Sequence, residues 1–250
     1  MVHSLEISES HASTCLNKAR QAFRLHQRET ACHWYTEADL HRRPDATLQD
    51  LADFLVVATE YRPDLARKIA RLLLTQDQPL PAVYVQDIFC CALFLPDPEL
   101  EELAIEHVLA GPLTPHLCLR VADMYFDYSS NRREQAKALL WVNRAATAEP
   151  LDFNDWAAKT HALYVLVEDN ERAAQVILSC AEKTIALASQ APAIDPTALD
   201  DLLEAFDYIT AGPALAKKLY EQVLLNEKLP LPDKHRIRQD QKEIIQEFDL

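Results

Sequence analysis

The sequence predicts an all-α fold, an irregular α-solenoid of about six helical hairpins followed by a C-terminal capping helix. Three observations support this prediction. Glycine occurs only twice in 250 residues, at Gly111 and Gly212, whereas β-hairpin turns and phosphate-binding loops depend on it. No segment alternates apolar and polar residues for long, as a half-buried strand does. A pattern of small and apolar residues also recurs about every 35 residues, which is typical of helical-hairpin arrays.

The recurring pattern is an Ala, an apolar residue three positions later and a small or apolar residue seven positions later. This spacing places all three on one stripe of a helix, and the small residue lets a neighbouring helix approach closely. The five matches begin 35, 72, 36 and 42 residues apart, and the longest gap leaves room for a degenerate unit within 98–113. The matches are Ala31/Trp34/Ala38, Ala66/Ile69/Leu73, Ala138/Trp141/Ala145, Ala174/Ile177/Ala181 and Ala216/Leu219/Val223.

Amphipathic stretches follow one another in pairs, and the turns between them contain proline or Asx residues. Pro63 is well placed for a first helical turn, and Ser130 or Asn131 is a candidate N-cap. The final segment is highly charged but carries Ile237, Ile244, Ile245 and Phe248 on one side, which suits a capping helix. The expected helix pairs are 48–61 with 62–74, 82–95 with 96–109, 116–129 with 130–146, 152–167 with 168–188, and 197–210 with 212–225.

These segments predict a simple domain organisation. We expect a flexible N-terminus over 1–12, one continuous repeat array over 13–232 and the capping helix over 233–250. The first residues lack the basic and apolar regions of a secretory signal. No run approaches the ~18 uncharged apolar residues of a membrane span. We therefore expect a cytoplasmic protein without a membrane span.

One unit resembles a known repeat family. The segment 122–146, ADMYFDYSSNRREQAKALLWVNRAA, resembles the SEL-like repeats, which are relatives of tetratricopeptide repeats. The segment 31–39 resembles the second half of such a unit, and the other hairpins look like loose tetratricopeptide hairpins. The family's turn glycines are replaced here by Tyr128 and Ser130. The resemblance implies a right-handed α-solenoid that binds proteins, with no catalytic residues to carry over. It rests on the Ala-x-Met-Tyr start, the Lys137-Ala138 pair, Trp141 and the closing Ala145-Ala146.

The charge distribution bears on the class of partner. The chain carries a net charge of −14. The segment 16–43 is nevertheless basic, with six Lys or Arg against three Asp or Glu. An acidic body repels phosphate backbones, so the sequence argues against a nucleic-acid partner. It is compatible with a basic protein partner, although a solvated acidic surface is the simpler interpretation.

Aromatic residues on the first helix of each hairpin are the candidate partner-binding residues. In related solenoids these helices line the concave face, where aromatic side chains anchor peptides at low entropic cost. They also fill helix–helix cores, so a structural role is the alternative for each. We predict a non-enzymatic interaction module, acting as scaffold, adaptor or dedicated chaperone, that binds a partner segment in the concave groove. The candidates are Tyr125, Tyr128, Trp156, Tyr164, Phe206 and Tyr208.

Two other surfaces are candidates for binding a partner or a second copy of the chain. The basic first hairpin around Arg20 and Arg24 is an alternative partner site. End hairpins of such arrays often pair, so a homodimer through the first or last unit is a further expectation.

The alternative function is a thiol- or metal-dependent sensor, or an enzyme, built on the same helices. The cysteines have no zinc-site spacing, and we interpret them as reduced, mostly buried thiols. Helix-spaced carboxylates are present at Asp123 and Asp127 and at Asp200, Asp201 and Glu204, but we interpret them as solvated faces. No phosphate-loop, nucleophile-elbow or zinc-protease motif occurs. We predict no cofactor and no metal. The cysteines are Cys15, Cys32, Cys90, Cys91, Cys118 and Cys180.

Overall fold

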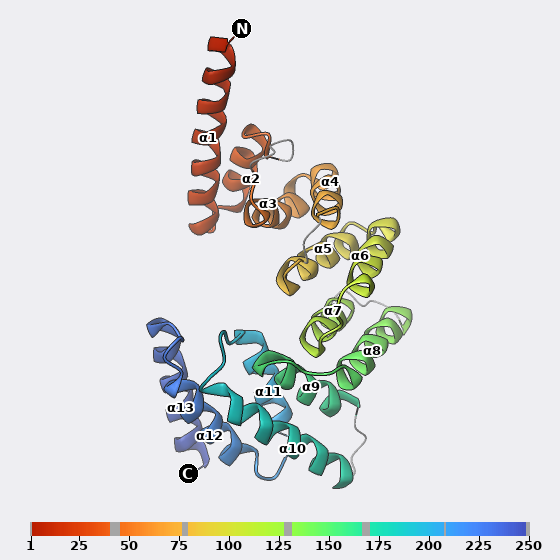
Figure 1. Cartoon of the computed structure of the whole chain (residues 1–250), viewed down its shortest axis with the longest axis vertical. Coiled ribbons are helices and arrows are strands. Elements are labelled where there is room, and N and C mark those ends of the chain that lie inside the picture. Colours follow the sequence, from red (N-terminus) through yellow and green to blue (C-terminus); the bar gives the residue numbers. More distant parts are fainter. Residues whose placement is uncertain are drawn as a thin grey trace. The chain divides into compact units, whose positions relative to one another are not determined.

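The computed structural model describes residues 2–40, 46–76, 80–127, 132–166, 171–207 and 209–248. All the regular structure in these residues is helical, without a strand, which confirms the all-α prediction (Figure 1). The chain divides into two compact units, unit 1 (Met1–Pro112) and unit 2 (Leu113–Leu250). Within the described residues, no helix is long and apolar enough to cross a bilayer.

Unit 1 is built from helices that pack against their neighbours in the chain. Helix α1 contacts α2, α3 contacts α4 and α5 contacts α6, while α3 also touches α2 and α5. Thr47 and Asp50 start α3 with a capping box, in which each side chain accepts a hydrogen bond from the other residue's backbone N–H. The helices are α1 (Val2–Arg24), α2 (Arg28–Glu37), α3 (Leu48–Tyr61), α4 (Pro63–Leu74), α5 (Ala82–Phe94) and α6 (Pro98–Ala110).

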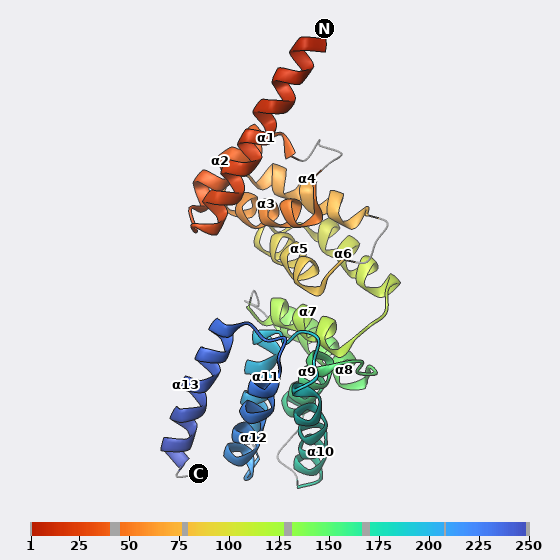
Figure 2. The same ribbon diagram turned by 60° about the vertical axis from the view of Figure 1, so that its left-hand side comes forward.

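Unit 2 has the same local order of contacts. Helix α7 packs on α8, α9 on α10, α11 on α12, and α12 on the last helix, α13 (Figure 2). The first helices also touch one another, because α9 contacts both α7 and α11; we call these three the α7–α9–α11 row. The helices are α7 (Pro115–Asp127), α8 (Arg132–Thr147), α9 (Phe153–Leu166), α10 (Glu171–Ala188), α11 (Pro196–Phe206), α12 (Gly212–Leu225) and α13 (Leu231–Phe248).

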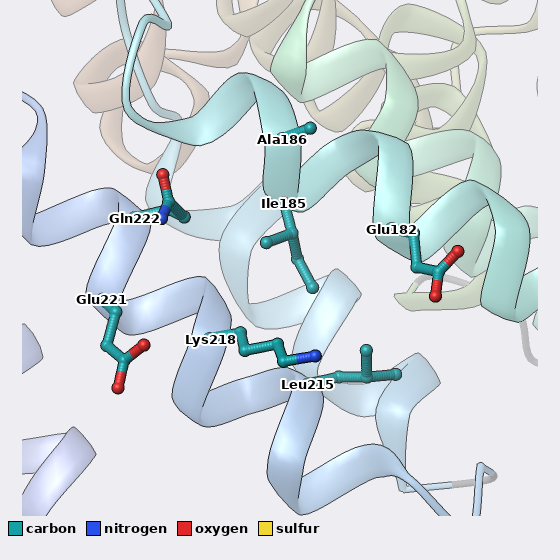
Figure 3. A pocket seen from close by; sticks show the side chains of 7 residues that line it. All are labelled: Glu182, Ile185, Ala186, Leu215, Lys218, Glu221 and Gln222. Atoms are coloured by element: carbon teal, nitrogen blue, oxygen red, sulfur yellow. The ribbon is translucent and has the colours of Figure 1, made fainter.

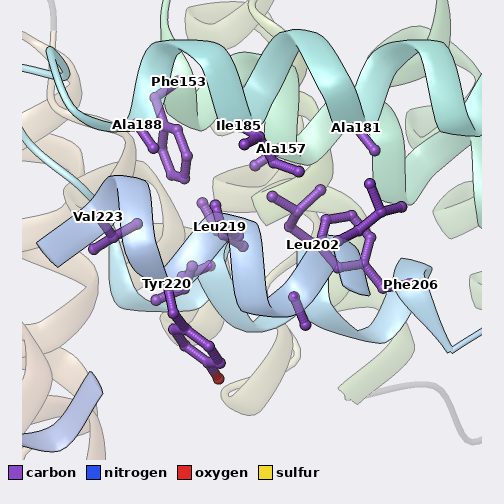
Figure 4. Packing of buried hydrophobic residues seen from close by; sticks show 14 of the residues in the cluster. Phe153, Ala157, Ala181, Ile185, Ala188, Leu202, Phe206, Leu219, Tyr220 and Val223 are labelled. Atoms are coloured by element: carbon purple, nitrogen blue, oxygen red, sulfur yellow. The ribbon is translucent and has the colours of Figure 1, made fainter. Parts of the chain in front are cut away.

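An apolar core joins the last five helices of unit 2. Phe153 from α9 and Phe206 from α11 are 1% and 2% exposed and pack among side chains of α10 and α12, as Figure 4 shows. Ile237 extends the same cluster to α13. Alanines at close approaches, such as Ala157 and Ala181, let the helices pack tightly. Burying this apolar surface is the main driving force that holds the unit together.

The five matches to the recurring pattern fall on α2, α4, α8, α10 and α12, which are the second helices of their pairs. Thirteen of their fifteen residues are buried. The exceptions, Trp34 and Ala174, are partly exposed. In α6, where the pattern is degenerate, Leu100, Ala104 and Val108 form the buried stripe. The pattern therefore identifies the face of each second helix that packs inward.

The local predictions agree with the structure in most helices. The expected bounds of α3 to α12 lie within a few residues of the observed ones, and Pro63 occupies the first turn of α4. Helix α13 begins at Leu231 and contacts α12 as a terminal helix. The candidate N-caps Ser130 and Asn131 lie outside the described residues.

The structure differs from the expected domain organisation at two places, and the expected domain bounds stay a prediction. The predicted flexible segment 1–12 is mostly helical, because α1 begins at Val2 and neither glycine nor proline interrupts the chain before Pro44. The array expected to be continuous over 13–232 is divided at Pro112. Here Gly111 ends α6 with an extended backbone, and the proline that follows cannot donate a hydrogen bond that would continue the helix.

Candidate functional site

A buried arginine connects two helices of the α7–α9–α11 row. Arg120 on α7 is 4% exposed. Its Nη1 lies 3.0 Å from Asp123 Oδ2, one turn along the same helix. Its Nη2 donates to Oδ2 of Asp201 on α11, a residue 81 positions later in the chain. One guanidinium thus serves two carboxylates, and it ties α7 to α11 across the face of α9.

Histidine side chains complete this network. His161 on α9 has its Nδ1 3.6 Å from Asp201 Oδ1, slightly too far for a hydrogen bond. Within the described residues, His161 Nδ1 and Arg120 Nε are buried without a hydrogen-bond partner. At the start of the row, His116 Nε2 lies 3.1 Å from Oδ2 of Asp195, the N-cap of α11. We call Arg120, Asp123, His161 and Asp201 the Arg120 network.

Burial dominates the electrostatics of the Arg120 network. It raises the pKa of Asp123 to about 6, although Arg120 favours the charged form. Burial also raises the pKa of Asp201 to about 6, against the attraction of Arg120 and His116. It lowers the pKa of His161 and so favours the neutral imidazole. By contrast, the contact with His116 lowers the pKa of Asp195 well below its usual range.

These positions correct the prediction that Asp123 and Asp201 belong to solvated faces. The side chain of Asp201 is 13% exposed and that of Asp123 is 30% exposed. Glu204 and Asp127, by contrast, are exposed as expected. Arg120 was not singled out from the sequence. The local signals of an unusual arginine are its place between Leu119 and Val121 and the carboxylate of Asp123 one helical turn later.

The structure separates the six aromatic candidates into three groups. Tyr125 and Phe206 are 1% and 2% exposed, so both are core residues and do not present their rings to a partner. Tyr164 and Trp156 on α9 are partly exposed. The Tyr164 ring lies 5.5 Å from that of His161, whereas Trp156 lies under Lys183 Nζ at 4.8 Å. Tyr128 and Tyr208 lie outside the described residues.

Unit 1 has a polar cluster of its own. Arg20 on α1 donates from Nε and Nη2 to the two carboxylate oxygens of Asp50 on α3, each at 2.7 Å. Nearby, Asp53 Oδ1 accepts from Gln49 Nε2, while Tyr35 Oη donates to its Oδ2 at 3.5 Å. Burial and the charge of Asp53 raise the pKa of Asp87 on α5 to about 7.

The cysteine side chains are mostly buried, as predicted from the sequence. Five of the six are buried, and Cys90 is partly exposed. Burial raises the pKa of the Cys91 and Cys118 thiols to about 11, and it also raises the pKa of Cys32 and Cys180. No group of three potential His, Cys, Asp or Glu metal ligands occurs within the described part of the chain.

Two pockets lie elsewhere on unit 2. The first, of about 390 Å³, lies between α10 and α12, with Ile185 and Leu215 among its apolar lining and Glu182, Lys218 and Glu221 among its polar lining (Figure 3). The second, of about 330 Å³, lies beside the segment that precedes α11 and the one that follows α12. Ile185 and Leu215 are 8% and 4% exposed, whereas Glu182, Ala186 and Glu221 in the lining of the first pocket are exposed.

Comparison with protein-family models and with curated proteins gives no match to this chain. The resemblance to SEL-like and tetratricopeptide repeats therefore stays a prediction from the residues quoted above.

Proposed function

We propose that this chain is a non-enzymatic interaction module in which paired helices form a short solenoid-like array. The pattern of helix–helix contacts supports this proposal. First helices touch each other in both units, and second helices touch in the pairs α4 with α6 and α10 with α12. Arrays of this kind present the row of first helices as an extended binding face. The right-handed twist implied by the family resemblance belongs to the same proposal.

The observation that carries the proposal is the chemistry of the α7–α9–α11 row. Exposed carboxylates of Asp127 and Glu204 lie near enough to the Arg120 network to act on Asp123, Asp201 and His161. Tyr164 adds a partly exposed ring beside His161. An acidic surface with an aromatic side chain suits a partner segment that carries Lys or Arg. We therefore propose that a basic protein segment binds across this row.

The thiol chemistry argues against the alternative function. A reactive or redox-sensing cysteine needs a lowered pKa and access to solvent. In this chain burial raises the pKa of four thiols, and Cys91 and Cys118, at 0% exposure, are the most deeply buried. A scaffold, adaptor or dedicated chaperone is thus the better proposal, and the cysteines are core residues within it.

Charge reversal on the binding face tests the proposal. Tagged wild-type chain and the double variant Asp127→Lys/Glu204→Lys would be used to capture proteins from source cells, with quantitative mass spectrometry of what co-elutes. We expect a stoichiometric basic partner whose capture falls about tenfold in the variant, a loss of roughly 1.4 kcal/mol. Both side chains are exposed, so the helices should remain intact, which circular dichroism checks.

The matched control is Glu182→Lys/Glu221→Lys, which reverses two exposed carboxylates on α10 and α12. This control has the same net charge as the test variant but leaves the α7–α9–α11 row unchanged. Capture lost only in the control would place the binding face on α10 and α12 and contradict the proposal. Equal losses in the two variants would show that net charge, and no defined face, decides binding.

A further inference from the structure

The Arg120 network has more negative than positive charge when its carboxylates are ionised. Asp123 and Asp201 share one guanidinium, and burial favours a neutral His161. The groups that face the network add to this imbalance. Asp127 acts on Asp123, and Glu204 on Asp201 and His161, while His116 is the further group that opposes them. Because a largely buried site screens charge poorly, this surplus is costly.

The geometry offers a place for one additional proton. His161 Nδ1 is buried, has no hydrogen-bond partner and lies 3.6 Å from Asp201 Oδ1. A proton on Nδ1 or on either carboxyl group would bring the charge of the Arg120 network to zero. A proton on Nδ1 would also let the imidazole donate to Asp201 after a small movement. Groups this strongly coupled titrate together, so the proton belongs to the set and not to a single residue.

We propose that Asp123, Asp201 and His161 share one proton at mildly acidic pH, and that this proton tightens the packing of α7, α9 and α11. At higher pH the proton leaves, and the repulsion between the ionised carboxylates loosens α11 from α7. The α7–α9–α11 row is thus a proton-sensitive element. This pH response goes beyond the proposed binding function, because it is a property of the chain without a partner.

The direction of the effect follows from where the proton binds more tightly. Burial raises the pKa of both carboxyl groups above their usual value of 3.8. The packed state therefore gains stability relative to an opened state as the pH falls from about 7 towards 4. His161 titrating alone would have the opposite effect, since a lowered pKa makes the packed state lose stability on acidification. The sign of the change thus distinguishes a shared proton from an isolated buried histidine.

Hydrogen exchange of the full chain, followed by mass spectrometry at pH 7.5 and pH 5.0, tests this inference. After correction for the intrinsic exchange rate, we expect the opening constant of α7 and α11 amides to fall about tenfold at pH 5.0, as one proton with these affinities requires. The imidazole of His161, followed by NMR, should change with the same midpoint. An opening constant that stays constant or rises at pH 5.0 would overturn the inference.

Three variants assign the effect to the network. Asp123→Asn removes the surplus charge, so α11 should be as protected at pH 7.5 as the wild type is at pH 5.0, with little further change on acidification. Asp201→Asn keeps an acceptor for Arg120 and should lose the pH dependence in the same way. This variant replaces Asp123→Asn in the test if Asp123→Asn folds poorly. Asp200→Asn, at the exposed neighbouring position on α11, should keep the tenfold change. A pH dependence retained by both network variants, or lost in Asp200→Asn, would contradict the inference.

Discussion

Units 1 and 2 each hold an arginine–aspartate pair between helices, but the two pairs differ in the number of carboxylates that one guanidinium serves. In unit 1, Arg20 binds Asp50 through two bonds of 2.7 Å, and the Thr47 hydroxyl and amide also donate to that carboxylate. In unit 2, Arg120 is divided between Asp123 and Asp201.

The difference decides the sign of the pKa shift. Burial alone would raise the pKa of Asp50, but the hydrogen bonds from Arg20 and Thr47 outweigh it and lower the pKa. For Asp123 and Asp201 the single guanidinium does not compensate for burial, and both values are raised. The comparison teaches that the number of donors per carboxylate, and not burial by itself, determines whether a buried acid stabilises a helix packing at neutral pH.

Replacing each arginine tests the difference between the two pairs and should give the largest effect. Arg120→Met leaves two carboxylates without their cation, so we expect the opening free energy of α7 and α11 to fall by about 3–5 kcal/mol at pH 7.5. Arg20→Met should cost less, about 2 kcal/mol for α3, because Thr47 still donates to Asp50. Hydrogen exchange resolved by helix measures both. Equal losses in the two variants would show that the sharing of Arg120 has no energetic consequence.

The two glycines allow a further test, because Gly212 lies against the backbone of Phe206, the last residue of the helix that carries Asp201. A Cβ on Gly212 would overlap the Phe206 carbonyl oxygen and lie 2.8 Å from its carbonyl carbon. Gly212→Ala should therefore displace the end of α11 and destabilise unit 2 by about 1–3 kcal/mol. Gly111→Ala is the matched control, since its Cβ would meet only Val108 O at an ordinary 3.8 Å. Urea unfolding compares the two, and equal losses would contradict the steric explanation.

Asp87 gives a third case, a partly exposed carboxylate whose pKa is not lowered by any cation among the described residues. Burial and Asp53 raise its pKa to about 7, so the ionised form opposes folding of unit 1. Asp87→Asn should stabilise α5 by about 1–2 kcal/mol at pH 8, and the gain should become small towards pH 4, where the folded wild type is protonated at Asp87 and the pH approaches the ordinary carboxyl pKa of 3.8. Hydrogen exchange of α5 at the two pH values measures this. A gain of the same size at pH 4 would contradict an electrostatic origin.

Much of the fold could be predicted from local patterns. Helix bounds followed from prolines, Asx residues and apolar periodicity, and the burial of Ile69, Trp141 and Leu219 followed from one spacing rule. The division at Pro112 was missed, because a Gly-Pro turn between two helices is the same local signal as any other turn. Only the gathering of tertiary contacts into two compact units reveals such a boundary.

The candidate site was predicted less well, for a physical reason. The aromatic candidates were chosen by their helix, but only the depth of packing shows that Tyr125 and Phe206 are core residues while Tyr164 is partly exposed. The carboxylates at Asp123 and Asp201 were noticed and interpreted as solvated. The three-residue spacing of Arg120 and Asp123 on one helix is compatible with their contact, but nothing near Asp201 in the sequence indicates that Arg120 also binds it.

The sequence by itself determined where helices begin and end and which stripe of each one is buried, because helix formation and capping depend on residues within a turn or two. The tertiary structure alone decided that Arg120 meets Asp201, 81 residues away, and that His161 lies beside them. Side chains on separate helices meet only after the helices dock. Their charges then depend on the burial that docking creates.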